Sequence, residues 1–506
     1  MLALSSFAAA QDAAALRNQV RAYRIQHQAE ILRSYADLLA IPNWASDSAN
    51  IRRNAEYIAG LLRARGVETR LLEHLGTPPV VYGELRAPGA TRTIVVYVHY
   101  DGQPAEAADW GGADPWKPIL RDKSLEDGGH EIPWPAPGAA IDPEWRIYAR
   151  SSSDDKAPIA GWLAALDALR ASGIAPSVNV KFFFEGEEEA GSPHLGEVLK
   201  KYAELLRGDL WLLCDGPVHQ TRRPQVVFGA RGITDLEITV YGPVRALHSG
   251  HYGNWAPNPA AELARLLSGL RDAQGRILVP GFYDDVRSLS ESERRALESV
   301  PEVEPQLRES LGLAHTEGNG RRLVELTMLP AINVRGLHSG AVGENARNAI
   351  PTEASASLDF RLVPNQTPAG VRRRVEDHLR SQGYWLTPET PSLEVRRRHA
   401  RIVKLEWRAG YPGARTSLDH PAAQAVTRVV EDALGPVIKM PTLGGSVPMH
   451  LFEDVLKTPV IILPIVNHDN NQHAANENLR LQNLWDGIEI YAAVLARLGP
   501  SWTPGP

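Results

Sequence analysis

Two kinds of hydrophobic pattern alternate along this chain and predict helices and strands in turn. Between helix-like segments lie short runs of β-branched and aromatic residues, which are typical of buried strands: VVYGELR, TIVVYVH, VNVKFFF, DLWLLC and TPVIILPIV. The segments with apolar residues at helical spacing are 20–39, 48–65, 159–171 and 422–435. This alternation predicts an α/β fold with a mostly parallel central sheet flanked by helices.

The hydrophobic pattern changes near Pro224. Residues 233–242 and 354–364 alternate apolar and polar positions, which is typical of strands with one exposed face. Further helices are expected at 258–273 and 288–312, and further strands at 393–398 and 402–408. The change predicts a second, α+β unit inserted into the first.

The length and composition fit two domains of a soluble globular protein. The chain has 506 residues, of which 43% are hydrophobic and 23% are charged. The net charge of −6 argues against a nucleic-acid-binding surface, and no segment is apolar for long enough to span a membrane. We expect an inserted domain at residues 225–412, and a larger domain with two parts at 11–224 and 413–506.

The first residues and the single cysteine bear on the cellular compartment. Residues 1–10 end in three alanines, as the cleavage region of a signal peptide does, but they carry no positive charge. Cys214 has no second cysteine to pair with inside the chain. Two localisations therefore stay open: cytoplasmic, or exported to the periplasm if residues 1–10 are the remnant of a signal peptide.

The stretch from Arg150 to Ser192 carries two carboxylate clusters around one helix and one strand. The first cluster precedes the helix, which either of its two aspartates can cap and which Gly173 can end. The second, EGEEE at 185–189, leaves the carboxyl end of the strand VNVKFFF. A glutamate run by itself is more often a solvated loop than a functional site.

Other polar residues also follow predicted strands. His99 and Asp101 follow TIVVYV, and Asp215 follows LWLLC; His473 comes soon after TPVIILPIV. Each residue alone is better explained as a hydrogen-bonded histidine or a turn former. Ligands of open α/β sheets bind outside the carboxyl ends of the strands, so their joint placement favours one functional site.

The donor types in this set indicate a metal. The five candidate ligands offer oxygen and imidazole but no thiolate, which suits zinc, manganese or cobalt: His99, Asp154, Glu189, Asp215 and His473. Many carboxylates in one cleft are costly unless cations neutralise them. Five ligands with one shared carboxylate suit two metals, and Glu188 beside them would be free to act as a base.

Eight motifs in this order resemble the zinc-dependent metallopeptidase family of carnosine dipeptidases, aminoacylases, glutamate carboxypeptidase and succinyl-diaminopimelate desuccinylase. The resemblance covers about residues 23–498 and is closest to the dipeptidase branch. The motifs are HYDGQP, SDDK-x-P, EGEEEAGS, GARG, LHSGHYGNWAPNP, RLVPNQ, GGSVP and H-x-x-NE.

The resemblance implies a role for each ligand. Asp154 would bridge two divalent ions, with zinc as the first choice and manganese or cobalt as alternatives. His99 and Asp215 would complete one metal site, and Glu189 and His473 the other. Catalysis would involve Glu188 as general base and acid and Asp101 as the group that orients His99. The peptide between Asp154 and Asp155 would be cis.

The resemblance also implies how a substrate would bind. The larger domain would be catalytic, and the inserted domain would be a lid and dimerisation domain. Its His248 would reach the site of a neighbouring subunit in a homodimer, although a plain turn histidine is an alternative. Arg361 and the turn formed by Gly444, Gly445 and Ser446 would bind the free carboxylate of the substrate, since a guanidinium is a planar fork of donors.

Two positions depart from the family pattern, and the substrate stays open. Ser151 and Ala157 replace the usual glycines on either side of the Asp-Asp pair, which bears on substrate fit more than on metal binding. We expect cleavage of a dipeptide-like amide by metal-activated water. The alternative is an N-acyl-amino-acid deacylase or carboxypeptidase on the same fold. A non-catalytic binding module would be expected to have lost ligands, and this chain keeps all five.

Overall fold

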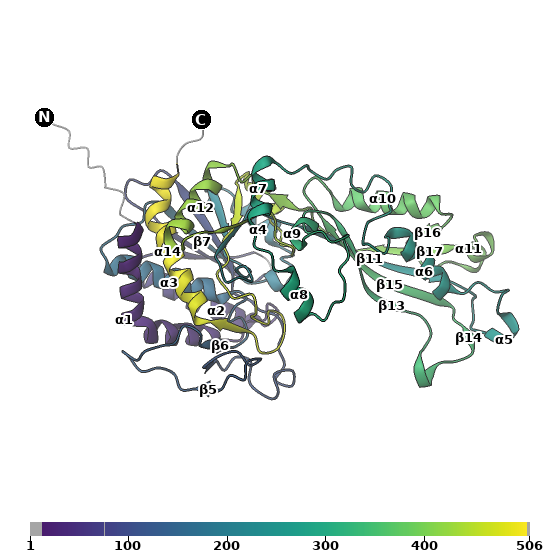
Figure 1. Cartoon of the computed structure of the whole chain (residues 1–506), viewed down its shortest axis with the longest axis horizontal. Helices are drawn as coiled ribbons and strands as arrows, with labels where there is room; N and C mark the ends of the chain where they lie inside the picture. The colour runs from purple at the N-terminus through teal and green to yellow at the C-terminus, as the bar shows by residue number, and fades with distance from the viewer. Residues whose placement is uncertain (1–12, 75, 503–506) are drawn as a thin grey trace.

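The computed structural model describes residues 13–74 and 76–502 and is built around an eight-stranded sheet (Figure 1). Its strand order is β1-β2-β7-β3-β8-β20-β9-β19. Neighbours β7, β3, β8 and β20 at the centre are parallel, as predicted. The strands are β1 (Glu68–Leu72), β2 (Val80–Leu85), β3 (Thr93–His99), β7 (Asn179–Glu185), β8 (Leu210–Leu213), β9 (Gln225–Val227), β19 (Ile438–Met440) and β20 (Val460–Ile462).

Helices cover both faces of this sheet because its strands are apolar on both sides. In β3, Val96 and Val98 belong to one core cluster, and Val95 and Tyr97 to the other. One face is covered by α1 (Ala13–Leu39), α2 (Ser48–Arg63), α3 (Lys156–Ala171), α12 (Pro421–Leu434) and α14 (Leu481–Ser501). The other is covered by α4 (Leu195–Lys201) and α13 (His450–Leu456).

A second, antiparallel-rich sheet lies in the inserted part of the chain. Its order is β13-β15-β11-β17-β16, and the side chains of β11 alternate strictly between buried and half-buried. Helices α6 (Pro259–Leu270) and α10 (Pro368–Ser381) bury its apolar face. The strands are β11 (Gly232–Tyr241), β13 (Ala331–His338), β15 (Glu353–Leu362), β16 (Trp385–Thr387) and β17 (Ile402–Trp407). The predicted α/β fold with an α+β insertion is confirmed, and its domain boundaries stay a prediction.

Two short helices of the inserted segment, α7 (Glu291–Ser299) and α9 (Leu323–Leu326), pack against the edge of the large sheet. A third, α8 (Glu304–Ser310), lies between them in sequence, and all three lie between the eight-stranded and five-stranded sheets in Figure 1. Leu297 of α7 and Val324 of α9 share a buried cluster with Ile438 of β19. The insertion therefore also covers the edge of the large sheet.

The structure contradicts one predicted strand and refines a helix. Residues 393–398 form the helix α11 (Leu393–Arg398), because Ser392 Oγ accepts the Val395 N–H at 3.3 Å and caps it. The stretch predicted as helical at 288–312 is split into α7 and α8 around Pro301. Residues 1–10, where a signal-peptide remnant was predicted, lie outside the described part of the chain.

The remaining elements are small. A four-stranded sheet, ordered β21-β6-β4-β5, joins β4 (Ile119–Arg121), β5 (Glu131–Ile132), β6 (Arg146–Tyr148) and β21 (Asn478–Arg480). The other short elements are η1 (Glu188–Ala190), β10 (Gly229–Ala230), β12 (Leu247–His248), α5 (Ser249–Tyr252), η2 (Gly343–Asn345), β14 (Ala349–Ile350) and β18 (Ala414–Arg415). Within the described residues, every helix is too short or too polar to cross a lipid bilayer.

Candidate metal centre

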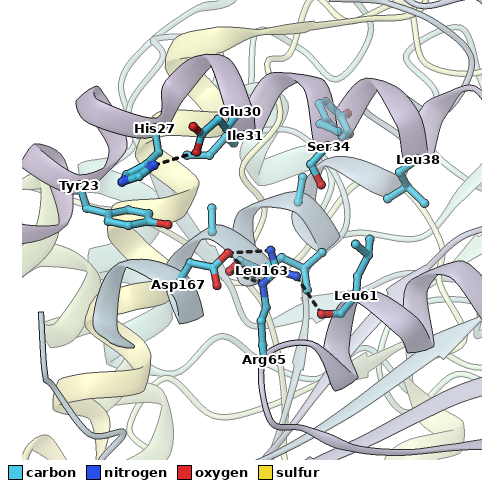
Figure 2. Close-up of a pocket in the computed structure, with 13 residues that line it drawn as sticks. Tyr23, His27, Glu30, Ile31, Ser34, Leu38, Leu61, Arg65, Leu163 and Asp167 are labelled. Atoms are coloured by element: carbon cyan, nitrogen blue, oxygen red, sulfur yellow. Dashed lines mark hydrogen bonds and ion pairs between the residues drawn. The ribbon is translucent and has the colours of Figure 1, made fainter. Parts of the chain in front are cut away.

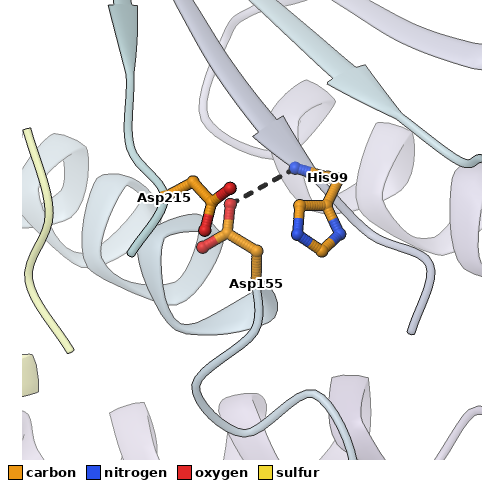
Figure 3. A group of neighbouring side chains, drawn as sticks. All are labelled: His99, Asp155 and Asp215. Carbon is orange, nitrogen blue, oxygen red and sulfur yellow. Dashed lines mark hydrogen bonds between the residues drawn. The ribbon is translucent and has the colours of Figure 1, made fainter. Parts of the chain in front are cut away.

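The carboxyl ends of neighbouring parallel strands bring the predicted ligands together. His99 ends β3 and lies opposite Glu185, the last residue of β7, and Asp215 follows β8 by two residues. Figure 3 shows His99, Asp155 and Asp215 converging from the end of a strand, the start of α3 and a loop. This is the sheet edge that the sequence predicted.

Two groups of three side chains in the described residues have the spacing of metal ligands. One contains His99, Asp155 and Asp215, and the other contains Asp154, Glu189 and His473; within each, one ligand atom per residue lies within 4.8 Å of the others. All five predicted ligands are thus present. Asp155, which the sequence suggested only as a helix cap, also lies in one of these groups.

Asp154 connects the two groups. Its Oδ1 lies 2.9 Å from His99 Nε2, and its Oδ2 lies 3.0 Å from His473 Nε2. Nε2 of His473 is also 3.3 Å from Glu189 Oε2. One carboxylate with an imidazole on each oxygen is the geometry expected of a ligand shared by two cations. The peptide bond between Asp154 and Asp155 is cis, as predicted.

The capping role that the sequence suggested for this aspartate pair is wrong. Asp155 occupies the residue before α3, but its side chain makes no capping hydrogen bond. Instead its Oδ2 accepts the backbone N–H of His99 at 3.3 Å (Figure 3). The carboxylate is turned toward the sheet edge, where it can serve the centre.

Asp101 contacts both His99 and the loop that carries Glu188 and Glu189. Its Oδ1 lies 3.4 Å from His99 Nδ1, and its two carboxylate oxygens accept the backbone N–H groups of Glu188 and Glu189 at 3.1 and 3.0 Å. One buried carboxylate therefore orients an imidazole and fixes the loop that carries the predicted base. The sequence predicted only the first contact. It also missed Gln103, whose Nε2 donates to Glu189 Oε2 at 2.7 Å.

Glu477 holds the loop of the aspartate pair by hydrogen bonds, and the sequence analysis gave it no role. It is fully buried, and its carboxylate accepts the N–H groups of Ser151, Ser153 and Asp154, each at 2.9 Å. Arg150 Nη1 donates to the same carboxylate at 2.8 Å. Pairing of β21 with β6 brings Glu477 under this loop.

Ser151 explains how the loop keeps its shape without the usual glycine. Its φ of 60° lies in the left-handed region, which a side chain disfavours. Its hydroxyl accepts a hydrogen bond from Asn43 Nδ2 at 2.8 Å, and the same amide group donates to Tyr100 O. These bonds hold the serine in place.

The electrostatics of the centre favour a cation. Burial, followed by the Asp154 charge, raises the pKa of Asp215 to about 6 and that of Glu189 to about 7. Burial also raises the pKa of Glu188 and of Asp155 well above the usual range. The raised pKa values indicate that the nearby positive charge does not compensate for the burial of these carboxylates.

The residues fit a divalent metal. Among the described residues, Asp155 Oδ1 is buried and has no hydrogen-bond partner, although its other oxygen is bonded. A buried unpaired carboxylate oxygen is costly, and a cation would satisfy it. Oxygen and imidazole donors without thiolate are also the set that zinc, manganese and cobalt accept.

The predicted carboxylate-binding residues also lie together. Arg361 Nη1 donates to Ser446 Oγ at 2.8 Å, and Arg361 Nε to Asp359 Oδ2 at 3.1 Å. Arg231, which the sequence analysis did not single out, donates from Nε to Gly444 O at 2.9 Å. Burial, followed by the Arg361 charge, lowers the pKa of Arg231 to about 10.

His248 does not join these residues within one chain. It immediately precedes α5, which Figure 1 places at the end of the small unit remote from the large sheet. The imidazole is exposed and accepts the Gly250 N–H at 3.1 Å. Its predicted reach into a neighbouring subunit stays a prediction.

The cavity in Figure 2 lies away from the predicted ligands, between α1, α2 and α3. Arg65 pairs with Asp167 at 2.6 Å, and His27 Nδ1 lies 2.8 Å from Glu30 Oε2. These acidic and basic side chains of the wall therefore already have partners within it.

Comparison with known proteins identifies the family. Residues 95–497 match the model of peptidase family M20/M25/M40. The chain belongs to this family. Its predicted closeness to dipeptidases is also confirmed: Cys-Gly metallodipeptidase dug1 of Schizosaccharomyces pombe is 28% identical over 428 residues, 83% of each chain. Beta-Ala-His dipeptidase of Homo sapiens is 25% identical over 504 residues, 95% of this chain and 92% of its own.

A solved structure agrees with this family. The M20 family metallo-carboxypeptidase Sso-CP2 from Sulfolobus solfataricus superposes with a TM-score of 0.74 at 28% identity, over 93% of this chain and 99% of that one. The expectation of a metal-dependent hydrolase of the peptidase class is confirmed. Family membership and the two ligand groups together indicate that the centre binds divalent metal.

Proposed function

We propose that this protein cleaves the peptide bond of dipeptides with a free carboxylate, using two divalent ions, with zinc as the first choice. The observation that carries the proposal is the Asp154 carboxylate between the imidazoles of His99 and His473. The dipeptidases among its relatives support the substrate class. Glu189 and Asp215 complete the ligand set.

Glu188 is the proposed base and acid. Bound divalent cations supply Lewis acidity, which makes a water acidic and polarises a carbonyl. Glu188 takes a proton from the attacking water and hands it to the leaving amine. Burial raises the pKa of Glu188 well above the usual range of a carboxyl group, which favours its taking up a proton. Asp101 holds the Glu188 backbone and so aims the carboxylate.

The free carboxylate of the substrate is proposed to bind between Arg361 and the turn of Gly444, Gly445 and Ser446. Arg361 already donates to Ser446 Oγ, so a ligand carboxylate can replace that acceptor. Arg231, bonded to Gly444 O, adds a second positive charge. This anchor fixes one end of the substrate while its amide lies at the centre.

A homodimer through the inserted domain is part of the proposal. The exposed His248 would complete the site of the neighbouring subunit and donate a hydrogen bond to the oxyanion. A donor of this kind contributes about 10²–10³-fold to the rate of such reactions.

The proposed base is tested by Glu188→Gln, which keeps the size of the side chain but cannot accept the proton. We expect kcat on dipeptides to fall by about 10²–10⁴-fold while metal content, measured by mass spectrometry, is unchanged. The control is Glu197→Gln, an exposed carboxylate on α4, which should leave both unchanged. A Glu188→Gln protein with most of its activity would refute the base.

N-acyl-amino-acid deacylation is the alternative, since the anion site suits any substrate with a free carboxylate. A panel of dipeptides and N-acyl amino acids, with added zinc, manganese or cobalt and with chelator as control, separates the two. Preference for dipeptides supports the proposal, and preference for N-acyl compounds replaces its substrate. Hydrolysis that survives the chelator would refute metal dependence.

A further inference from the structure

An apolar cavity of about 280 Å³ lies where the inserted segment meets the large sheet, and its lining includes Pro217, two residues after Asp215. Its walls come from the loop after β8, from β19 and the following turn, and from the segment of α8 and α9. About 15 Å³ of such space holds one water, so the cavity has room for a group much larger than water.

Helix α9 forms the outer wall and is firmly held. Arg322 donates to Val300 O at 2.8 Å, and the Leu323 N–H is bonded to Glu304 Oε1 at 2.9 Å. A Cβ atom added to Gly444 would lie only 3.5 Å from Thr327 Cγ2, so this segment approaches the predicted carboxylate-binding turn. The wall is a fixed part of the site rather than a loose loop.

The cavity is built for an uncharged group. None of the described residues that line it is Asp, Glu, Lys or Arg. Burial lowers the pKa of its two histidines, His219 and His468, which favours their neutral form. The cavity in Figure 2, by contrast, has two ion pairs in its wall. A charged side chain entering the apolar cavity would lose its water without gaining a partner.

The position of the cavity indicates which side chain it receives. Its lining includes Gly444 of the turn proposed to bind the substrate carboxylate. It also includes Pro217, two residues after Asp215, in a segment fixed by the Val218 N–H to Val466 O bond at 2.8 Å. In a dipeptide, the Cα atom between the carboxylate and the amide nitrogen belongs to the C-terminal residue.

We propose that this cavity is the side-chain subsite for the C-terminal residue of the substrate, and that it selects bulky aliphatic or aromatic side chains. This inference rests on the proposed function and names its substrate class. Leu323 lines the cavity and is 43% exposed to solvent, and it is the residue that sets the accepted size.

The test uses the full chain loaded with zinc and two dipeptide series, Ala-Xaa and Xaa-Ala, in which Xaa is Gly, Ala, Leu, Phe, Asp or Lys. In the Ala-Xaa series we expect kcat/KM to rise about 10-fold or more from Gly to Leu, and to be lowest for Asp and Lys. The variant Leu323→Trp narrows the cavity and should reduce the ratio of Ala-Leu to Ala-Gly by about 10-fold. Leu323→Ala should shift the preference from Leu toward Phe.

The matched control is Leu311→Trp, which adds the same ring at an exposed leucine of the same segment outside the cavity. It should leave the ratio unchanged. Equal effects of Leu323→Trp on all substrates, or a side-chain preference confined to the Xaa-Ala series, would overturn the inference.

A binding measurement separates this inference from the proposed function. Calorimetry with N-acetyl-leucine, N-acetyl-glycine and N-acetyl-aspartate should give the tightest binding to the leucine compound, and Leu323→Trp should remove that advantage. If no peptide is cleaved but this preference holds, the proposed function fails and the subsite stands. If dipeptides are cleaved without any preference in rate or binding, the subsite fails and the function stands.

Discussion

The large sheet and the inserted segment differ in how deeply they bury their candidate functional residues. At the edge of the eight-stranded sheet, Asp101, Asp155 and Glu477 are buried and bonded to backbone or imidazole groups. In the inserted segment, Arg361 on the five-stranded sheet is half-buried, and His248 on the two-stranded sheet of β12 and β14 is exposed. The contrast indicates that the candidate metal site is held in place before a ligand binds. Arg361 and His248, which we propose to contact the substrate, stay accessible to solvent.

The largest expected effect comes from Glu477→Ala. The substitution leaves Arg150 and the loop N–H groups buried without their acceptor, which costs about 3–5 kcal/mol of unfolding free energy. Metal content should fall as well, because the loop carries Asp154. Chemical unfolding and metal analysis check both.

Its control is Glu489→Ala, which removes another buried carboxylate, bonded to Arg21 at 2.9 Å but remote from the metal ligands. Because Arg21 is 46% exposed, water can replace its partner, and the loss should be smaller with metal retained. Equal losses of metal in both variants would show that Glu477 acts only through general stability.

The next effect concerns the small unit. His248→Ala should reduce kcat by about 10²–10³-fold without changing metal content. If His248 serves a neighbouring subunit, mixing this variant with Glu188→Gln restores one working site in each mixed dimer. Activity should then recover to about a quarter of the native value, since about half of the dimers are mixed.

The mixing experiment has its own control. Asp215→Asn and Glu188→Gln both alter the large unit, so their mixture should stay inactive. Absence of recovery in the first mixture, with dimers present, would assign His248 a role within its own chain or none.

The smallest effect is the pH dependence of metal binding. Burial raises the pKa of Asp215 to about 6 and of Glu189 to about 7, and the hydrogen bond to Asp154 raises that of His473 to about 8. Below its pKa each group holds a proton that the cation must displace, so affinity falls as pH falls from 8 to 5.5. We expect about 10-fold per pH unit for each proton released, measured by calorimetric titration with zinc. An affinity that is constant over this range would contradict these shifts.

The sequence predicts the candidate ligands better than the residues that hold them in place. His99 and Asp215 are recognisable because each follows an apolar strand, and parallel strands end at one edge. The position of Glu477 in the sequence does not reveal its role. It accepts hydrogen bonds from backbone N–H groups, which every segment of a chain has, so no sequence motif marks its partners. Asp155 was assigned to a cap because local patterns do not tell which way a side chain turns.

The fold shows the same limit. Strongly apolar runs such as β3 and β7 are recognised as buried strands from their own residues, and both strands are predicted correctly. The segment 393–398 is short and mostly polar, so its hydrophobic pattern does not separate a helix from a strand. The cap by Ser392 favours the helix. The packing of α7 and α9 on β19 depends on contacts distant in sequence, which periodicity does not contain.

Strand register in the small sheet has a consequence for folding fidelity. Ile233 pairs with Arg361, so the backbone ladder sets Arg361 at a fixed offset from Arg231. A slip of one residue between β11 and β15 would turn every side chain of β15 to the opposite face, Arg361 included. A chain mispaired in this way would keep the candidate metal ligands but displace the arginine that we propose for the substrate carboxylate. Since β11 and β15 are far apart in sequence, an error in their pairing would yield molecules that bind metal but do not select substrates with a free carboxylate.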